Sequence, residues 1–534
     1  MNYLFLGIVV IIYLIITAFL GYLGYLRTKG TTDYLLAGRK THPVIMALSY
    51  GATFISTSAI VGFGGAASLY GFGILWLTFM NIFVGIFIAF AFFGIRTRKM
   101  GHNLDAHTFP EFLGLRFQSK FLQLASGLLI FTAMPLYTAS VIIGGTQFLS
   151  QTLNISYEVA LIFFVAVVSI YVIMGGLKGV MYTDAFQGTI MFLGMFILVA
   201  FTYAKLGGVV NAHKSLSALA PEAINIWGKI GHQGWTKLPA FNSILWWQLI
   251  STIVMGVGIG VLAQPQLVVR FMTVKSGHEI NRANLIGGLF ILMMTGGAFV
   301  VGNLTNVYFY NTLGKISFLA AEKKVDNVIP LFVSKAMPQW FTAIFMVTLL
   351  AAAMSTLSSQ FHTMGSAFGR DFLEKGLNVK TKNPLFIVKL AMGVTVIIST
   401  LLAYYLPHFF EQGSAIIAIG TSLFFGLCAS TFLPMYVGAI YTRRITKAGA
   451  LACFWSGLFS SLFWMVFVHL KESKPLGICK MIFGMDSLAK NPIVQNVDPI
   501  VIALPVSILF TIAITLMTKP PSEKFLEKVF KGIK

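Results

Sequence analysis

The stretch Ser49-Tyr50-Gly51-Ala52-Thr53-Phe54-Ile55-Ser56-Thr57-Ser58 decides the fold, because it places small and hydroxyl-bearing residues inside an apolar segment. That segment covers residues 43–70 and is longer than the about 20 residues that a helix needs to cross a membrane. Glycines at positions 62, 64 and 65 follow the polar stretch. Irregular backbone is tolerated at membrane depth only where it is buried in protein or lines a cavity. We therefore predict a broken helix that faces the interior of a helical membrane protein.

A second apolar segment, residues 243–265, is interrupted in the same way. Three glycines lie between positions 256 and 260, and Pro265 follows. The two interruptions are about 200 residues apart, and broken helices in corresponding places of two halves indicate a transporter built from inverted repeats. The pattern predicts a first repeat over 43–204 and a second over 243–441, with five core helices in each.

The composition excludes a water-soluble protein. Hydrophobic residues make up 57% of the 534 residues and charged residues 10%, with a mean hydropathy of +0.82, whereas a soluble chain is about a quarter charged. We predict an all-α membrane protein, a single transmembrane domain over 1–534 with about 13 spans. The predicted spans are 3–25, 43–70, 73–95, 121–149, 157–175, 181–204, 243–265, 283–310, 339–366, 384–406, 412–441, 446–470 and 498–518. A leading helix (3–25), two trailing helices (446–518) and a tail (520–534) thus flank the two repeats.

Basic residues are distributed unevenly between the two predicted sides of the membrane. The net charge is +21, but the 38 Lys and Arg residues lie in short connectors between apolar runs, which argues against a nucleic-acid partner. An odd number of spans places the termini on opposite sides, and an N-out, C-in arrangement puts all ten arginines inside. The tail 520–534 carries an apolar stripe that predicts a helix on the inner leaflet, the alternative being a solvated end.

Four hydroxyl-bearing residues gather in the ninth predicted span. Ser355, Thr356 and Ser359 share one helical face with Ala352, and Ser358 borders that face. A hard cation needs several oxygen ligands that converge on one point, and an unwound helix can add carbonyl oxygens to such hydroxyls. The alternative is structural, because Ser and Thr also bond the carbonyl four residues earlier or let helices approach closely.

Asp184 is the one carboxylate placed well inside a predicted span. An unpaired charge is costly at that depth, so Asp184 is expected to bind a cation or carry a proton. The nearest basic residues, Lys178 and Arg270, are expected at the cytoplasmic ends of their helices, too far away to neutralise it. The alternative is a group near the interface that bonds Thr183 or solvent. Tyr137, in the fourth span, is expected to face a cavity, with packing or an interfacial position as the alternative.

Five segments of the chain carry a resemblance to a known family. They are Asp33-Tyr34-Leu35-Leu36-Ala37-Gly38-Arg39, Ala47-Leu48-Ser49-Tyr50-Gly51-Ala52, Gly175-Gly176-Leu177 with Tyr182-Thr183-Asp184, Gln264-Pro265-Gln266 through Val269-Arg270-Phe271-Met272, and Ala352-Ala353-Met354-Ser355-Thr356-Leu357-Ser358. In this order they resemble the sodium:solute symporter family, which includes the sodium/proline, pantothenate, sugar and monocarboxylate cotransporters. The resemblance implies a LeuT-like fold with extra helices at both ends. It also implies sodium-coupled import across the plasma membrane by alternating access.

The resemblance further implies two ion sites. The first sodium ion would be bound by the carbonyls of Ala52, Ile55 and Ala352 and the hydroxyls of Ser355 and Thr356. Some members of the family bind a second sodium ion lower down, and the matching residues here are Asp184, Ser355, Ser358 and Ser359. One or two sodium ions are therefore the expected cofactor. The expected partners are a small-molecule solute and the lipid bilayer, and no obligate protein partner is evident.

The solute is expected beside the first helix break. The residues that the resemblance places there are Thr53, Phe54, Ser56, Thr57, Tyr137, Val257 and Val261. The sodium/proline members carry an aspartate in place of Phe54 and aromatic residues in place of Val257 and Val261, which disfavours proline. A small solute whose carboxylate is held by half-helix amides is expected instead, such as a monocarboxylate, an amino acid or a pantothenate-like acid.

The chain contains no HExxH, GxSxG or P-loop motif, so an enzymatic role is not expected. Three alternatives to sodium-coupled carboxylate import stay open. The first is a proton-coupled carrier with Asp184 as the titrating group. The second is a sugar cotransporter of the same fold, and the third is a solute sensor or channel built on this scaffold.

Overall fold

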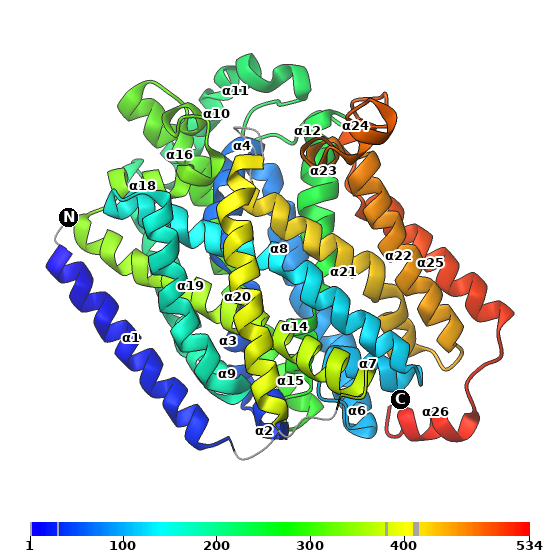
Figure 1. The fold of residues 1–534 in the computed structure, drawn as a ribbon. Coiled ribbons are helices and arrows are strands. Elements are labelled where there is room, and N and C mark those ends of the chain that lie inside the picture. Colours follow the sequence, from blue (N-terminus) through cyan, green and yellow to red (C-terminus); the bar gives the residue numbers. More distant parts are fainter. Residues whose placement is uncertain (1–2, 29–30, 380–382, 410–415, 534) are drawn as a thin grey trace.

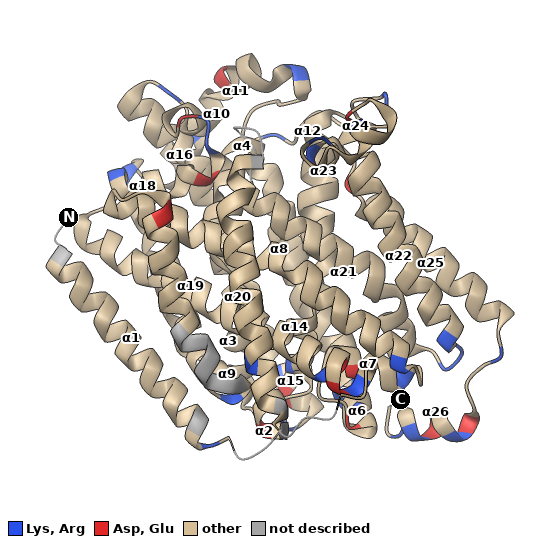
Figure 2. Cartoon of the chain, viewed as in Figure 1, with Lys and Arg blue, Asp and Glu red and all other residues tan. Residues whose placement is uncertain are grey.

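The apolar segments form a helical bundle, and Figure 2 shows most of the charged residues at its two ends. The computed structural model describes residues 3–28, 31–379, 383–409 and 416–533. Throughout these residues the regular elements are helices, and the one β-type pairing is an isolated bridge between Thr41 and Val274. The predicted all-α architecture is confirmed.

The helices follow the order of the predicted spans. Those of the first half are α1 (Tyr3–Leu26), α3 (Pro43–Phe54), α4 (Phe63–Tyr70), α5 (Leu75–Ile82), α6 (Ile95–Leu104), α8 (Lys120–Leu153) and α9 (Tyr157–Lys205). Those of the second half are α12 (Ile244–Trp247), α13 (Gly258–Gly260), α14 (Pro265–Phe271), α15 (Gly277–Ile291), α16 (Gly297–Leu313), α19 (Gln339–Ser366), α20 (Pro384–Phe409) and α21 (Ile416–Tyr441), followed by α22 (Lys447–Phe467) and α25 (Ile500–Met517). The π-helical segments η2 (Ser58–Gly62), η4 (Phe83–Gly94), η6 (Gln248–Val257), η8 (Leu292–Gly296) and η10 (Ala367–Gly376) continue the helices beside them.

Short helices occupy the connections. They are α2 (Thr31–Leu36), α7 (Phe109–Arg116), α10 (Val209–Ala218), α11 (Ala220–Trp227), α17 (Ser317–Ala320), α18 (Val328–Ala336), α23 (Leu470–Leu476), α24 (Ile478–Phe483) and α26 (Glu523–Val529). Figure 1 shows α10, α11 and α24 at one end of the bundle and α2, α6 and α26 at the other. The beginning of α1 and the helix α26 also lie at opposite ends of the bundle (Figure 1), which is the arrangement expected for an odd number of crossings.

Eleven helices in the described residues are long and apolar enough to cross a membrane. They differ from the thirteen predicted spans at two places. Ser58–Leu104 runs as one helical stretch through the predicted boundary near position 71, while Pro43–Phe54 is a shorter apolar helix. The other place is α9, within which both predicted spans 157–175 and 181–204 lie. Its part Leu177–Lys205 is long and apolar enough to cross a membrane, while its part Tyr157–Ser169 is a shorter apolar helix.

Both predicted helix breaks are present. The first ends α3 at Phe54, because Ile55 has extended backbone with φ −91° and ψ 106°. The second lies at Gln264, with φ −73° and ψ 117°, and Pro265 then opens α14 at the position where proline favours a helix start. Just before that break, Gly260 lets α13 approach α21 closely, since a Cβ atom there would lie 2.4 Å from a backbone carbonyl oxygen of α21.

The first break lies at the centre of the bundle. Helix α3 packs against α9, α15 and α19, and α19 in turn packs against α1, α8 and α9. Nearly all side chains of α19 are buried. This packing places the broken end of α3 directly beside the hydroxyl-rich part of α19.

The C-terminal helix α26 packs on protein, which corrects the expectation that its apolar stripe lies on the inner leaflet. Leu526 and Val529 are at most 1% exposed. The Phe530 ring lies 5.4 Å from the guanidinium of Arg116 on α7, and Asn103 on α6 donates its amide to the carbonyl of Val529 at 3.0 Å. The stripe is thus covered by the predicted cytoplasmic ends of α6 and α7.

Candidate functional site

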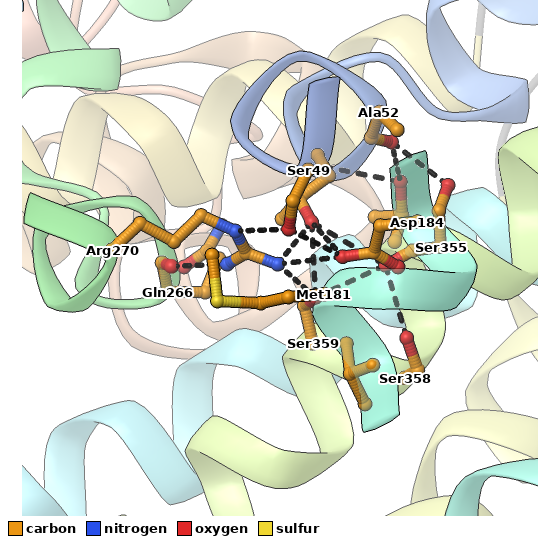
Figure 3. Close-up of polar contacts among 12 residues, drawn as sticks. Ser49, Ala52, Met181, Asp184, Gln266, Arg270, Ser355, Ser358 and Ser359 are labelled. Atoms are coloured by element: carbon orange, nitrogen blue, oxygen red, sulfur yellow. Dashed lines mark hydrogen bonds and ion pairs between the residues drawn. The ribbon is translucent and has the colours of Figure 1, made fainter. Parts of the chain in front are cut away.

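The first helix break presents backbone carbonyls to α19. Ser355 Oγ donates to the carbonyl oxygen of Ala52 at 2.9 Å, a contact drawn in Figure 3. Thr356 Oγ1 donates to the carbonyls of Ala52 at 3.3 Å and Thr53 at 3.1 Å, and Ser355 Oγ also donates to the carbonyl of Ala352 at 3.2 Å. All of these residues are fully buried. Four of the five residues predicted to bind the first cation therefore lie together.

Ile55, the fifth predicted ligand, ends α3. Its N–H bonds the carbonyl of Gly51 at 2.8 Å, while its extended backbone turns the chain out of the helix, which frees its carbonyl from the helical ladder. Freed carbonyls together with hydroxyls of a neighbouring helix are the ligands that a small hard cation prefers. The arrangement can hold a monovalent cation without a charged side chain.

Asp184 forms a buried ion pair with Arg270, shown in Figure 3. Asp184 Oδ2 lies 3.0 Å from Arg270 Nη2, and the two side chains are 0% and 1% exposed. Ser49 Oγ on α3 donates to the same Oδ2 at 2.8 Å. The expectation that no basic residue neutralises Asp184 is therefore wrong, because Arg270 points from α14 into the bundle.

Arg270 joins α14 to three other helices. Its Nε donates to Ser49 Oγ on α3 at 3.1 Å, and its Nη2 donates to Ser359 Oγ on α19 at 2.6 Å. Asp184 adds α9, and Nη1 donates to the carbonyl of Gln266 within α14 at 2.6 Å. The planar fork of five donors suits such a hub. Sequence reasoning missed this role, because a helix of 7 residues shows no periodicity that would assign Arg270 to a face.

Ser358 and Ser359, predicted to bind a second cation with Asp184 and Ser355, lie next to the ion pair. Both hydroxyls donate to the carbonyl of Ser355, at 3.1 Å and 3.0 Å, which is the structural alternative considered for this cluster. Asp184 Oδ1 has no hydrogen-bond partner among the described residues. One carboxylate oxygen thus remains for a cation, beside the oxygens of α19.

A small cavity lies beside the first break, where the solute was predicted. Phe54, Ser56, Tyr137 and Val257 line it, and its volume of about 20 Å³ is room for roughly one water. The Tyr137 ring meets the Phe425 ring edge-on at 5.2 Å. The lining also includes Ile55, Ser58, Ala59, Phe63, Leu77, Asn81, Thr295, Phe299, Thr421 and Phe425, and none of these residues is charged. The wall is therefore apolar and aromatic, with a few neutral oxygens.

The other three predicted solute residues point elsewhere. Thr53 Oγ1 lies 3.0 Å from a hydroxyl of α19 next to the ion pair. Thr57 Oγ1 donates to a carbonyl of α8 at 2.6 Å. Val261 packs beside Phe54 against Gly85 on η4. None of these three side chains lines the cavity.

Sequence reasoning missed Asn81 and Thr295 as lining residues. Asn81 had a signal, because it is the one amide in the otherwise apolar predicted span 73–95. Its side chain is 2% exposed, and Oδ1 has no hydrogen-bond partner within the described part of the chain. Thr295 lies in the π-helical segment η8, where spacing from neighbouring helix turns does not predict the face that a side chain takes.

Comparisons with known proteins agree with this geometry. The model of the sodium:solute symporter family matches residues 34–457. The high-affinity proline transporter PutP of Bacillus subtilis (strain 168) is 28% identical over 453 residues, covering 83% of this chain and 89% of that protein. The osmoregulated proline transporter OpuE of the same organism is 27% identical, covering 89% of this chain and 90% of that protein.

Solved structures share the fold. A Na+-coupled sialic acid symporter in a substrate-bound outward-open state superposes with a TM-score of 0.71 at 19% identity, covering 97% of this chain and 98% of that one. Mhp1, a nucleobase-cation-symport-1 transporter, superposes with a TM-score of 0.52 at 14% identity, covering 94% and 98%. The two broken helices and the helix order thus have the LeuT-like arrangement.

These matches extend over most of the chain. The family model covers both broken helices, the ion pair and the hydroxyl cluster of α19. The relatives are named as transporters and not as enzymes, and this chain, with eleven described helices that could cross a membrane, is a multi-pass membrane protein of the same kind. The chain belongs to the sodium:solute symporter family.

Proposed function

We propose that this symporter imports a small organic solute that bears a carboxylate, together with one or two sodium ions, by alternating access in an N-out, C-in orientation. The observation that carries the proposal is the contact of the Ala52 carbonyl with the hydroxyls of Ser355 and Thr356 at the first helix break. A cage of neutral oxygens of this kind suits sodium. It provides carbonyl and hydroxyl ligands but lacks the carboxylates that divalent cations prefer.

The first sodium ion is assigned to the carbonyls and hydroxyls named above, at Ala52, Ile55, Ala352, Ser355 and Thr356. In this structure the two hydroxyls donate their hydrogens to carbonyls of α3 and α19. A bound cation would turn them, so that their lone pairs face the ion. The ion would then replace the hydrogen bonds as the link between α3 and α19. Ion occupancy is thereby coupled to the position of the broken helix.

A second sodium ion is assigned to Asp184, Ser355, Ser358 and Ser359. Arg270 holds Oδ2 of Asp184 in this structure, so the ion would bind Oδ1, which has no partner in the described residues. Sharing one carboxylate between a guanidinium and sodium weakens the hold on each. We therefore expect the second ion to bind more weakly than the first.

The solute is assigned to the cavity lined by Phe54, Ser56, Tyr137 and Val257, which must widen to admit it. Because the lining residues of this cavity are uncharged, a carboxylate would be balanced by the bound sodium and by amides of the broken helix. The aromatic wall would pack on the apolar part of the solute. An apolar monocarboxylate best matches a site with one end for the carboxylate and an aromatic wall for the rest of the solute.

Proline is the second candidate, because relatives that are 28% and 26% identical are named as proline transporters. Its ammonium group would need an acceptor inside the cavity. The neutral oxygens of Ser56 and Asn81 are available on the wall, but a carboxylate is not, since Phe54 stands where the proline members are expected to have an aspartate. A monocarboxylate has no ammonium group, so it needs no such acceptor.

The sodium gradient is sufficient to drive accumulation. Each sodium ion contributes about 2.3 kcal/mol per 100 mV and about 1.4 kcal/mol per tenfold concentration gradient. Two ions supply roughly 7 kcal/mol for a neutral solute, and roughly 5 kcal/mol for a monoanion whose charge cancels one of theirs.

Uptake into proteoliposomes tests the proposal. We expect uptake that needs sodium and that monocarboxylates inhibit best in a panel with amino acids, pantothenate and sugars. Uptake driven by a pH gradient without sodium would favour the proton-coupled carrier. Inhibition chiefly by sugars would favour the sugar cotransporter, and sodium flux in no fixed ratio to solute would favour a channel.

A further inference from the structure

A polar track runs along one face of α19 and η10, starting at the ion pair. Ser359, His362, Thr363 and Ser366 follow at i, i+3, i+4 and i+7, and together with Asp371 they line one cavity. The twelve residue steps from Ser359 to Asp371 span roughly 18 Å of helix. The track therefore leads from the ion pair to the predicted cytoplasmic end of the bundle.

The facing wall comes from α14 and from the segment that opens α7. Gln266 and Arg270 line the end of the cavity next to the ion pair. His107 and Thr108 line the end toward the predicted cytoplasmic side. The cavity volume of about 20 Å³ is room for roughly one water. In this structure the track therefore has no room for an organic solute, and a partly hydrated ion would need the track to widen.

Three buried polar atoms on this track have no hydrogen-bond partner within the described part of the chain. They are Asp371 Oδ2, His362 Nδ1 and Gln266 Oε1, on side chains that are 0%, 5% and 2% exposed. Buried polar groups are nearly always satisfied, by protein, by water or by an ion. The two oxygens can accept from water or bind a cation, and the ring nitrogen accepts when the imidazole proton is on Nε2. The cavity is also lined by Arg270, whose guanidinium is paired with Asp184, so the unpaired oxygens are the groups that would favour a cation.

Asp371 adds a buried carboxyl group to this wall, which carries a full negative charge only when it is ionised. Its Oδ1 accepts from Thr108 Oγ1 and Gln123 Nε2, each at 2.8 Å, and it makes no ion pair with any described residue. The guanidinium of the adjacent Arg370 is held by Glu111 at 3.0 Å. A buried carboxylate that lacks an ion pair is costly, and a cation in the track would offset that cost.

We propose that this track is a transit site for a partly hydrated sodium ion on its way from the α3–α19 site to the cytoplasm, with Asp371 Oδ2 as its charged ligand. His362 Nδ1 and Gln266 Oε1 accept hydrogen bonds from the water that the ion keeps. The inference rests on the proposed sodium coupling. It goes beyond that proposal because none of these three atoms belongs to the two assigned sodium sites.

Asp371→Asn is the sharpest variant, because Asn keeps the Oδ1 acceptor for Thr108 and Gln123 and removes only the charged Oδ2. We would measure the sodium half-saturation separately at each face, in proteoliposomes of defined orientation. The half-saturation at the cytoplasmic face is expected to rise about tenfold, equivalent to about 1.4 kcal/mol. The value at the outer face should stay that of the parent protein. Equal changes at both faces, or no change, overturn the transit site.

Gln123→Met is the matched control, since it removes a partner of Oδ1 and does not line the track. Parent values at both faces are expected. If Gln123→Met reproduces the effect of Asp371→Asn, then Asp371 acts by positioning α8, and the inference is lost. An effect of Asp371→Asn that varies with pH and is indifferent to sodium would identify a proton as the occupant and would equally overturn it.

Ser366→Cys supplies a second test that does not depend on Asp371. Silver ion, a thiol-reactive cation close to sodium in size, is added from the cytoplasmic side; it should react with the introduced thiol, and raised sodium should slow the reaction. Absence of reaction from that side contradicts a hydrated track. A parent protein without sodium dependence would remove the proposed function itself, whereas a sodium-dependent parent with a symmetric Asp371→Asn effect removes only the transit site.

Discussion

Arg270 Nη2 and Asp184 Oδ2 lie 3.0 Å apart in the bundle, and neither side chain is more than 1% exposed. The contact joins the two repeats, because Asp184 belongs to α9 and Arg270 to the helix after the second break. Both residues also bond Ser49 on the first broken helix. Any movement of α3 or α14 during transport must therefore break this pair or carry it along.

The ion pair is expected to dominate the stability of this region. Asp184→Asn or Arg270→Gln alone should lower the free energy of unfolding by about 3–5 kcal/mol, because each leaves a buried charge without its partner. The double variant should cost clearly less than the sum of the two. Denaturant unfolding in detergent measures all three. As a control, Arg443→Gln removes an ion pair to Glu523 whose side chains are 57% and 76% exposed and should cost under about 1 kcal/mol. Additive single effects would contradict the pairing.

The second sodium ion predicts cooperative sodium dependence. The parent protein should give a Hill coefficient for sodium above one, which falls toward one in Asp184→Asn and in Ser358→Ala/Ser359→Ala. Initial uptake rates titrated against sodium at two pH values provide the measurement. A parent coefficient of one, with one sodium ion moved per solute, would exclude the second site. A rate that depends on pH and loses that dependence in Asp184→Asn would instead identify a proton carrier.

The solute preference should follow the residue at position 54. With Phe54 in the wall, an apolar monocarboxylate is expected to compete for uptake better than proline. Phe54→Asp should reverse the order, because it places a countercharge for an ammonium group in the cavity. Val257→Leu, a neutral change in the same wall, is the control and should leave the order unchanged. Proline as the best competitor of the parent protein would show that Phe54 has been misinterpreted.

Membrane orientation can be tested by labelling. Lys229→Cys and His102→Cys place exposed thiols at opposite ends of the bundle, and the native Cys428, Cys453 and Cys479 are buried. An impermeant maleimide applied to intact cells should label position 229 and spare position 102. Labelling at 102 but not at 229 would reverse the N-out, C-in assignment.

Sequence reasoning located the parts of the site whose signal is local. The two helix breaks were visible because small, hydroxyl and proline residues interrupt apolar runs, and the structure has both. The hydroxyl cluster of α19 was visible because Ser355, Thr356 and Ser359 repeat at helical spacing. Their contact with Ala52 was expected only from the family resemblance. The helix break and the hydroxyl cluster are about 300 residues apart in the sequence, and no sequence pattern indicates that they are in contact.

Sequence reasoning could not predict which side of a short or irregular helix a given residue occupies. Arg270 turns inward from a helix of two turns, Thr295 lies on a π-helical segment, and the stripe of α26 meets α6 and α7 where a lipid surface would have satisfied it equally well. For Arg270 and for the stripe of α26, residues that the sequence places at a helix end or on a surface are instead bound by a tertiary partner. Whether a charged side chain such as Arg270 is buried depends on a partner of opposite charge elsewhere in the chain, and no local sequence pattern identifies that partner.

The most direct test of the account is the sodium half-saturation of Ser355→Ala and Thr356→Ala. Each variant removes one oxygen from a site with few ligands, so each should raise the half-saturation about tenfold, or about 1.4 kcal/mol, and the double variant should raise it further with the protein still folded. Thr348→Ala is the control on the same helix, since its hydroxyl bonds a carbonyl of α19 itself at 3.2 Å, and its sodium dependence should match the parent. A folded double variant with the sodium half-saturation of the parent protein would contradict the sodium site at the break of α3.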